Sequence, residues 1–210
     1  MDDLTPILDL VYKRYNLGKL DKINILEIGT GEGKNSTKIL YNFFKKNKFN
    51  IISYEGMDKL YNIASNYWKN TNNVTIVNEY FTKKNDIFEL LIPNLPSYIA
   101  DYKETSERFI NKYKLLFNSN NNFFTKIEYE PNIIFIDSSR FMHLPIINLC
   151  FELTNYNSNA IIIMEEDYFI NNKYGELEII DKFFNLKDVI KYPKGSWQWP
   201  FVSFIIESKK

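Results

Sequence analysis

Residues Asn24 to Gly33 have the composition of a turn that binds a small molecule. They begin as a short apolar strand, pass through the acid Glu27 and continue into glycines at positions 29, 31 and 33. Glycine lets the chain turn sharply and lets a ligand lie against bare backbone. A helix is expected over about residues 34–45, because apolar residues recur there at helical spacing. Its free N–H groups would point toward the ligand.

The spacing of these glycines excludes two common phosphate-binding motifs. A dinucleotide-binding turn has the pattern Gly-x-Gly-x-x-Gly, but Lys34 stands where the last glycine would be. A P-loop needs a glycine five residues before its Gly-Lys pair and a Ser or Thr after that pair, and these positions hold Ile28 and Asn35. The pattern that remains is Glu-x-Gly-x-Gly-x-Gly after an apolar strand.

This pattern resembles motif I of the class I S-adenosylmethionine-dependent methyltransferases. Residues 50–55 agree with the resemblance, because they form a second apolar strand that ends in Glu55. Nucleotide-binding folds hold ribose hydroxyls with an acid at about this distance beyond the loop. The resemblance implies S-adenosylmethionine as cofactor, with Glu55 on its ribose. The cofactor site that it implies consists of Glu27, Gly29, Thr30, Gly31, Gly33, Asn35, Ser36, Glu55, Gly56 and Asp137.

Acids also follow the fourth and fifth expected strands, residues 133–136 and 160–164. Asp137 follows the fourth strand, and Glu166 and Asp167 follow the fifth. The carboxyl ends of parallel strands meet at one edge of a sheet, and carboxylate oxygens are the ligands that Mg²⁺ prefers. A divalent cation lowers the pKa of a bound hydroxyl, which assists methyl transfer to an alcohol. Asp137, Glu166 and Asp167 are therefore candidate ligands for Mg²⁺ or another divalent cation.

The same segments resemble those of the metal-dependent O-methyltransferases, a group that includes catechol enzymes and antibiotic- and sugar-modifying relatives. The chain departs from that pattern at Arg140, where a histidine is usual, and this departure fits an acidic or phosphate-bearing acceptor. His143 is the only histidine, and the pKa of an unperturbed histidine would suit a general base, although a lone histidine is more often structural. The candidate catalytic residues are Asp137, Arg140 and His143.

The expected acceptor is a hydroxyl group of a sugar or glycan. Trp197 and Trp199 lie in the loop before the last strand, and Tyr168 follows the fifth. Aromatic faces bind sugar rings, but they also pack in cores, so the two roles stay open for the tryptophans. Two alternatives remain: a catechol-like or other small-molecule acceptor, and a catalytically inactive subunit that binds S-adenosylmethionine as a scaffold.

The order of the expected elements predicts an α/β fold. Strands alternate with helices after a leading helix over residues 4–15, and this order is typical of a mostly parallel sheet. We expect a single Rossmann-like methyltransferase domain over residues 1–210, with a seven-stranded sheet, helices on both faces and a final antiparallel strand. About residues 81–132 have no plain strand pattern, and we interpret them as an insertion or lid between the third and fourth strands.

Composition limits the partners and the location. The 210 residues include 26 basic and 26 acidic ones, and this balance gives no reason to expect a nucleic-acid partner. Apolar runs are too short to cross a membrane, and the acidic start does not fit a signal peptide. The single cysteine, Cys150, suits a reducing compartment. We therefore expect a cytoplasmic or otherwise intracellular protein that acts on a small molecule or glycan, with a homodimer as a candidate assembly.

Overall fold

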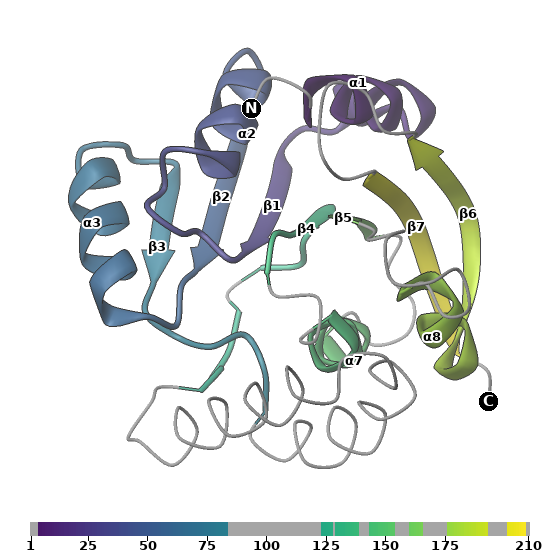
Figure 1. The fold of residues 1–210 in the computed structure, drawn as a ribbon. Coiled ribbons are helices and arrows are strands. Elements are labelled where there is room, and N and C mark those ends of the chain that lie inside the picture. Colours follow the sequence, from purple (N-terminus) through teal and green to yellow (C-terminus); the bar gives the residue numbers. More distant parts are fainter. Residues whose placement is uncertain are drawn as a thin grey trace.

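A seven-stranded sheet forms the centre of the molecule (Figure 1). The computed structural model describes residues 4–83, 123–127, 129–138, 143–153, 160–165, 176–192 and 201–208. The strands lie in the order β3-β2-β1-β4-β5-β7-β6. Their bounds are β1 Ile23–Ile28, β2 Phe49–Tyr54, β3 Val74–Val77, β4 Ile133–Ile136, β5 Ile161–Glu165, β6 Phe184–Tyr192 and β7 Phe201–Ser208.

The direction of the strands confirms the expected fold class. Strands β1 to β5 are parallel to one another, and β1 lies in the middle of this group with β2 on one side and β4 on the other. Strand β7 is antiparallel to both of its neighbours, β5 and β6. The sequence therefore correctly predicts an α/β fold with a mostly parallel sheet and a final antiparallel strand.

Helices cover both faces of the sheet, as expected (Figure 1). The helices are α1 Leu4–Arg14, α2 Ser36–Phe44, α3 Asp58–Trp68, α7 His143–Leu153 and α8 Glu176–Phe183, with a short 3-10 helix, η1, over Leu17–Lys19. Side chains of α1, α2 and α3 share one buried cluster, and side chains of α7 and α8 share the other. Among the described residues, no helix is long and apolar enough to cross a membrane.

The strands β1 and β4 are apolar on both sides because both sides are buried. In β4, Ile133 and Phe135 belong to the cluster under α1 and α2, whereas Ile134 and Ile136 belong to the cluster under α7. Strand β1 alternates in the same way, but its fifth residue is the acid Glu27, which is fully buried. A charged residue inside such a strand needs polar partners.

The described ends of the expected insertion lie side by side. Tyr80 and Phe123 form an isolated parallel bridge, and the carbonyl of Tyr80 accepts a hydrogen bond of 2.9 Å from the backbone N–H of Phe124. The Tyr54 hydroxyl donates to the carbonyl of Lys126 at 2.9 Å. The chain therefore returns to the end of β3 before it enters β4. The rest of the expected insertion, residues 84–122 and residue 128, lies outside the described residues.

Helix α2 should contribute strongly to stability through Phe44, which is fully buried between α1 and the sheet. We expect Phe44→Ala to lower the free energy of unfolding by about 3–5 kcal/mol, because it removes buried apolar surface and leaves a cavity. Denaturant unfolding measures this change. Leu10→Ala is the matched control, since Leu10 on α1 is 41% exposed and its loss should cost within about 0.5 kcal/mol. Equal losses in the two variants would contradict this packing.

Candidate active site

A cavity of about 380 Å³ lies at the carboxyl ends of β1, β2, β3 and β4. This volume is in the range of pockets that bind small molecules, and the carboxyl edge is where open α/β sheets bind ligands. Gly29, Thr30, Gly31 and Asn35 line it from the loop after β1. The residues that line it after the other three strands include Glu55, Gly56, Met57, Glu79, Tyr80, Phe81, Asp137 and Ser138.

The three glycines of the loop have positive φ angles for different structural reasons. Gly29, at φ 97°, lies so close to β4 that a Cβ atom would be 1.8 Å from the carbonyl oxygen of Asp137. Gly33, at φ 71°, lies against Trp68, whose indole N–H donates to its carbonyl at 2.8 Å. At Gly31, with φ 56°, a Cβ atom would meet no other described atom within 4 Å. Gly31 therefore faces the open pocket, whereas Gly29 and Gly33 allow close packing.

Glu55 ties the glycine loop to the end of β2. One of its carboxylate oxygens accepts the N–H of Gly31 at 2.8 Å, and the other accepts the N–H of Met57 at 2.9 Å. Burial raises the pKa of Glu55, and these two hydrogen bonds oppose the shift. Each carboxylate oxygen keeps a further lone pair, so the side chain can still accept hydrogen bonds from a ligand in the pocket.

Glu27 lies beneath the loop and does not line the pocket. Its Oε2 atom accepts the hydroxyls of Ser53 at 2.6 Å and of Thr37 at 2.7 Å. The Ser53 hydroxyl is also 2.5 Å from that of Thr30. Burial raises the pKa of Glu27 to about 7, against the effect of these hydroxyls. Sequence reasoning missed this network, although Ser53 is a polar residue within an apolar strand and so a signal for it.

The pocket brings together only part of the predicted cofactor site. Thr30, Gly31, Asn35 and Gly56 line it, as do Gly29, Glu55 and Asp137. Glu27, Gly33 and Ser36 are buried and do not line it. The motif identifies the loop, but it does not say which way each side chain points.

Asp137 follows β4 and lines the pocket next to the glycine loop. Its backbone N–H donates to the carbonyl of Ile28 at 2.8 Å, which holds the ends of β1 and β4 together. The surrounding protein limits solvation of the carboxylate and thereby raises its pKa. A carboxylate with a raised pKa is a better proton acceptor than an ordinary one.

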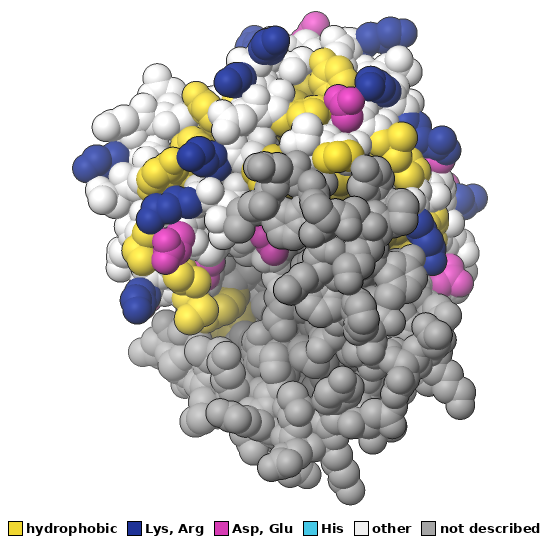
Figure 2. Space-filling model, turned by 45° about the horizontal axis from the view of Figure 1, so that its top comes forward, with side chains coloured by type: hydrophobic (Ala, Val, Ile, Leu, Met, Phe, Trp, Pro, Cys, Tyr) yellow, Lys and Arg dark blue, Asp and Glu magenta, His cyan; other side chains and the backbone are white. Residues whose placement is uncertain are grey.

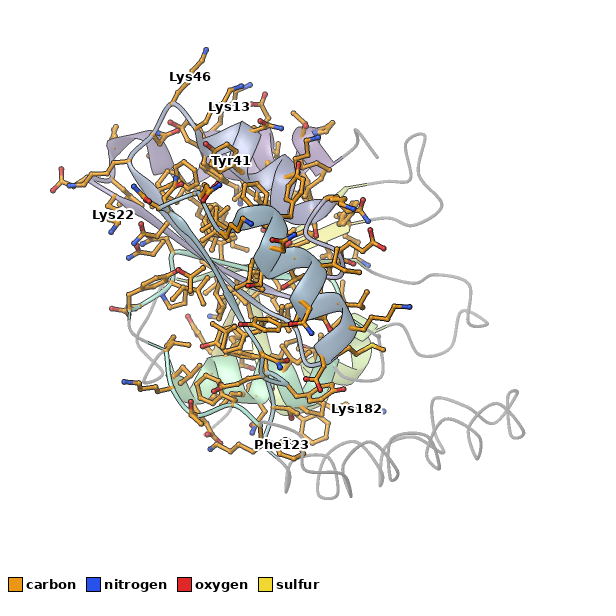
Figure 3. All side chains as sticks on the ribbon, turned by 90° about the vertical axis from the view of Figure 1, so that its left-hand side faces the viewer. Lys13, Lys22, Tyr41, Lys46, Phe123 and Lys182 are labelled. Atoms are coloured by element: carbon orange, nitrogen blue, oxygen red, sulfur yellow. The ribbon has the colours of Figure 1, made fainter. Side chains whose placement is uncertain are left out.

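An apolar wall closes the side of the pocket after β2 and β3. The ring of Tyr80 lies over Gly56, where a Cβ atom would be 2.3 Å from it. Phe123 packs beside Tyr80 with ring centroids 6.4 Å apart, at the end of the molecule opposite Lys46 (Figure 3). Sequence reasoning missed Met57, Tyr80 and Phe81, and their place directly after two strands is the signal that could have found them.

Charge is distributed unevenly between this pocket and the outer surface. Three lining residues are acids, Glu55, Glu79 and Asp137, and none of the described lining residues is Lys, Arg or His. The carboxylate of Glu79 accepts hydrogen bonds from the Thr125 hydroxyl at 2.9 Å and from its N–H at 3.1 Å. Lys and Arg side chains instead spread over the outer face drawn in Figure 2. Such a pocket favours a cation and disfavours a pyrophosphate.

The predicted metal and acceptor residues remain predictions. The residues that lie outside the described part of the chain are Arg140, Glu166, Asp167, Tyr168, Trp197 and Trp199. His143 begins α7, but its side chain is not described. Within the described ranges there is no group of three His, Cys, Asp or Glu residues that could hold a metal ion. Asp137 is the only predicted metal ligand that the described pocket contains.

Comparison with solved structures defines the class of fold. The chain superposes on the N-methyltransferase NodS from Bradyrhizobium japonicum with a TM-score of 0.52 and 10% identity, over 100% of both chains. It superposes on a chain of the fibrillarin/Nop5p complex with a TM-score of 0.51 and 10% identity, over 90% of this chain and 74% of that one. No family model and no curated protein matches the sequence. The chain has the Rossmann-like fold of the class I methyltransferases.

Two alanine variants should separate packing from ligand binding in the glycine loop. Gly29→Ala would force a Cβ atom into the Asp137 carbonyl, so we expect it to lower the free energy of unfolding by about 2 kcal/mol or more. Gly31→Ala should cost only about 1–2 kcal/mol, the cost of a left-handed conformation. Its methyl group would enter the open pocket, so we expect a loss of S-adenosylmethionine affinity of at least about tenfold, or about 1.4 kcal/mol.

Denaturant unfolding and calorimetric titration measure the two effects. If Gly31→Ala binds the ligand as well as the wild type does, the loop does not contact it. If Gly29→Ala is as stable as the wild type, the close approach to Asp137 is not a constraint.

Proposed function

We propose that the chain is an S-adenosylmethionine-dependent methyltransferase. The observation that carries this proposal is the combination of a glycine loop with a pocket in which the charged residues among the described lining, Glu55, Glu79 and Asp137, are all acids. S-adenosylmethionine carries a positive sulfonium, which these carboxylates would attract. Dinucleotide and nucleotide triphosphate cofactors carry several negative charges, which Glu79 and Asp137 would repel. Glu55 does not distinguish them, because dinucleotide-binding folds also place an acid on the ribose. The fold supports the proposal but would also accommodate other ligands.

Different lining residues suit the ribose, the adenine and the methionine portion of this cofactor. Glu55 would accept hydrogen bonds from the ribose hydroxyls through its remaining lone pairs. Tyr80, Phe81 and Met57 form a wall that suits the flat adenine ring. The backbone of Gly29 to Gly31 would border the methionine portion, because Gly31 leaves the space in front of it open. When bound, the cofactor supplies the methyl group and its leaving group.

We further propose that the acceptor is a hydroxyl oxygen. The Asp137 carboxylate opens into the pocket next to the loop, and its raised pKa suits it to take the proton that an alcohol must lose. By resemblance, Asp137 with Glu166 and Asp167 would hold Mg²⁺ or a similar cation. Such a cation would lower the pKa of the acceptor hydroxyl. The resemblance to sugar-modifying relatives and the aromatic residues Tyr168, Trp197 and Trp199 favour a sugar or glycan over a catechol.

A screen for methyl uptake tests the activity and the class of acceptor. The purified chain would be incubated with S-adenosylmethionine labelled in the methyl group and with nucleotide sugars, glycosides and catechols, each with and without Mg²⁺. We expect transfer to at least one sugar hydroxyl. Transfer to catechols alone would contradict a sugar acceptor and favour the alternative, a catechol-like small molecule. Cofactor binding without transfer to any acceptor would instead favour the inactive scaffold.

A variant of Asp137 tests the chemistry of the acceptor side. We expect Asp137→Asn to lose at least about 100-fold in turnover, because its amide cannot accept the acceptor's proton. Cofactor affinity should stay within about tenfold, or about 1.4 kcal/mol. Excess chelator on the wild type should have the same effect if a metal takes part. The control is Glu32→Gln, an exposed acid beside the loop that is paired with Lys34 and does not line the pocket.

Full turnover by Asp137→Asn would exclude Asp137 as the base. An amide oxygen can still bind Mg²⁺, so full turnover by Asp137→Ala is the result that would exclude Asp137 as a necessary metal ligand. Full wild-type turnover in excess chelator would exclude a metal from the reaction and leave His143 or a carboxylate as the base.

A further inference from the structure

The carboxyl group of Glu27 is only half satisfied by hydrogen bonds. The bonds that it accepts from Ser53 and Thr37 both go to its Oε2 atom. Its Oε1 atom is buried and forms no hydrogen bond of normal geometry among the described residues. The hydroxyl of Ser36, at the start of α2, lies near enough to lower the pKa of Glu27 but also forms none. A buried carboxylate in this state is poorly stabilised, because a charge taken out of water needs all of its lone pairs satisfied.

The surroundings of Glu27 contain no compensating positive charge among the described residues. Strand β2 presents Ser53 and α2 presents Ser36 and Thr37, all of them neutral. On the other side, β4 places Phe135 in register with Glu27, and Asp137 lies just beyond. The charge of Asp137 adds to burial in raising the pKa of Glu27 to about 7. In the ligand-free protein, Glu27 is therefore partly protonated at neutral pH.

A line of hydroxyls connects Glu27 to the pocket. The Ser53 hydroxyl has one proton, which it donates to Glu27, so the contact of 2.5 Å to Thr30 requires the Thr30 hydroxyl to donate to Ser53. Thr30 lines the pocket beside Gly31. The ionised form of Glu27 therefore fixes the direction of both hydroxyls and directs negative charge toward the loop.

We propose that binding of a cationic ligand in the pocket drives one proton from Glu27 into solution. This inference rests on the proposed function, since the sulfonium of S-adenosylmethionine is the cation concerned. The O–H bond of the Glu27 carboxylic acid breaks, its electron pair stays on the carboxylate, and the buffer takes the proton. Glu27 does not touch the ligand, so it is a positioning residue that acts through the loop and its charge.

The expected effect is a rise in the affinity for S-adenosylmethionine with pH. Below about pH 7 the ligand-free protein holds the proton, and binding must remove it, which weakens affinity there. Well above this pH the proton is already gone and affinity is at its maximum. Each unit by which the bound cation lowers the pKa of Glu27 gives up to about a tenfold change across the titration.

Calorimetric titration of the full chain with S-adenosylmethionine from about pH 5.5 to 8.5, on both sides of the pKa of Glu27, measures this effect. Two buffers with different ionisation enthalpies give the number of protons released, which should be about one half near pH 7 and approach one near about pH 6 if the shift is large. S-adenosylhomocysteine, which lacks the sulfonium charge, should show a smaller dependence on pH. A wild-type affinity that is flat over this range, with no proton released, would overturn the inference.

Glu27→Gln is the decisive variant, because its amide imitates the protonated acid and keeps an oxygen acceptor for Ser53 and Thr37. It should bind S-adenosylmethionine at every pH as weakly as the wild type does at low pH. The acids Glu55 and Asp137 remain in this variant. If its affinity for S-adenosylmethionine changes with pH as much as that of the wild type does, the released proton comes from these acids and the inference is overturned.

If Glu27→Gln does not fold, Thr37→Val serves in its place, because it removes a hydroxyl that lowers the pKa of Glu27. The rise in affinity should then move to higher pH, and an unmoved rise would overturn the inference. If neither ligand binds at any pH, the proposed function itself fails. Binding of both ligands without a released proton contradicts only the present inference.

Discussion

At the end of β1 the backbone of Gly29 lies so close to the carbonyl of Asp137 that no side chain could fit between them. This contact brings the ends of β1 and β4 together, and the hydrogen bond from Asp137 N–H to Ile28 fixes their register. The loop that follows must then turn away from β4 and toward β2. The open space in front of Gly31 is the result, and the pocket forms around it.

Two carboxylates hold this loop from opposite sides. Glu55 accepts the N–H of Gly31 from the pocket side, and Glu27 binds hydroxyls of β2 and α2 from below. Both acids lie in or next to the core, where burial raises the pKa and makes a negative charge costly. A positive charge in the pocket would reduce that cost. The packing of the loop and the preference for a cationic ligand therefore have the same physical origin.

The sheet was predictable because β1, β2 and β4 are mostly apolar runs that are followed by glycine or an acid. The position of strand β7 between β5 and β6 depends on long-range pairing of strands, which no local sequence pattern encodes. In the site, the positions of Gly31, Glu55 and Asp137 followed from spacing, since strand ends meet at one edge. The side-chain direction of Glu27 did not, because it depends on Ser53 and Thr37, which come from other elements. The place of Tyr80 after β3 was a signal in the sequence, but its packing against Phe123 depends on the return of the chain and could not be predicted.

The acidic lining of the pocket predicts that it selects a positively charged nucleoside and rejects phosphate-bearing ones. Calorimetric titration of the purified chain with S-adenosylmethionine, and separately with NAD⁺ and ATP, tests it most directly. We expect saturable binding of S-adenosylmethionine at one molecule per chain, and no binding of either phosphate-bearing ligand at the same concentrations. Binding of NAD⁺ or ATP in preference to S-adenosylmethionine would contradict the account of the pocket's charge.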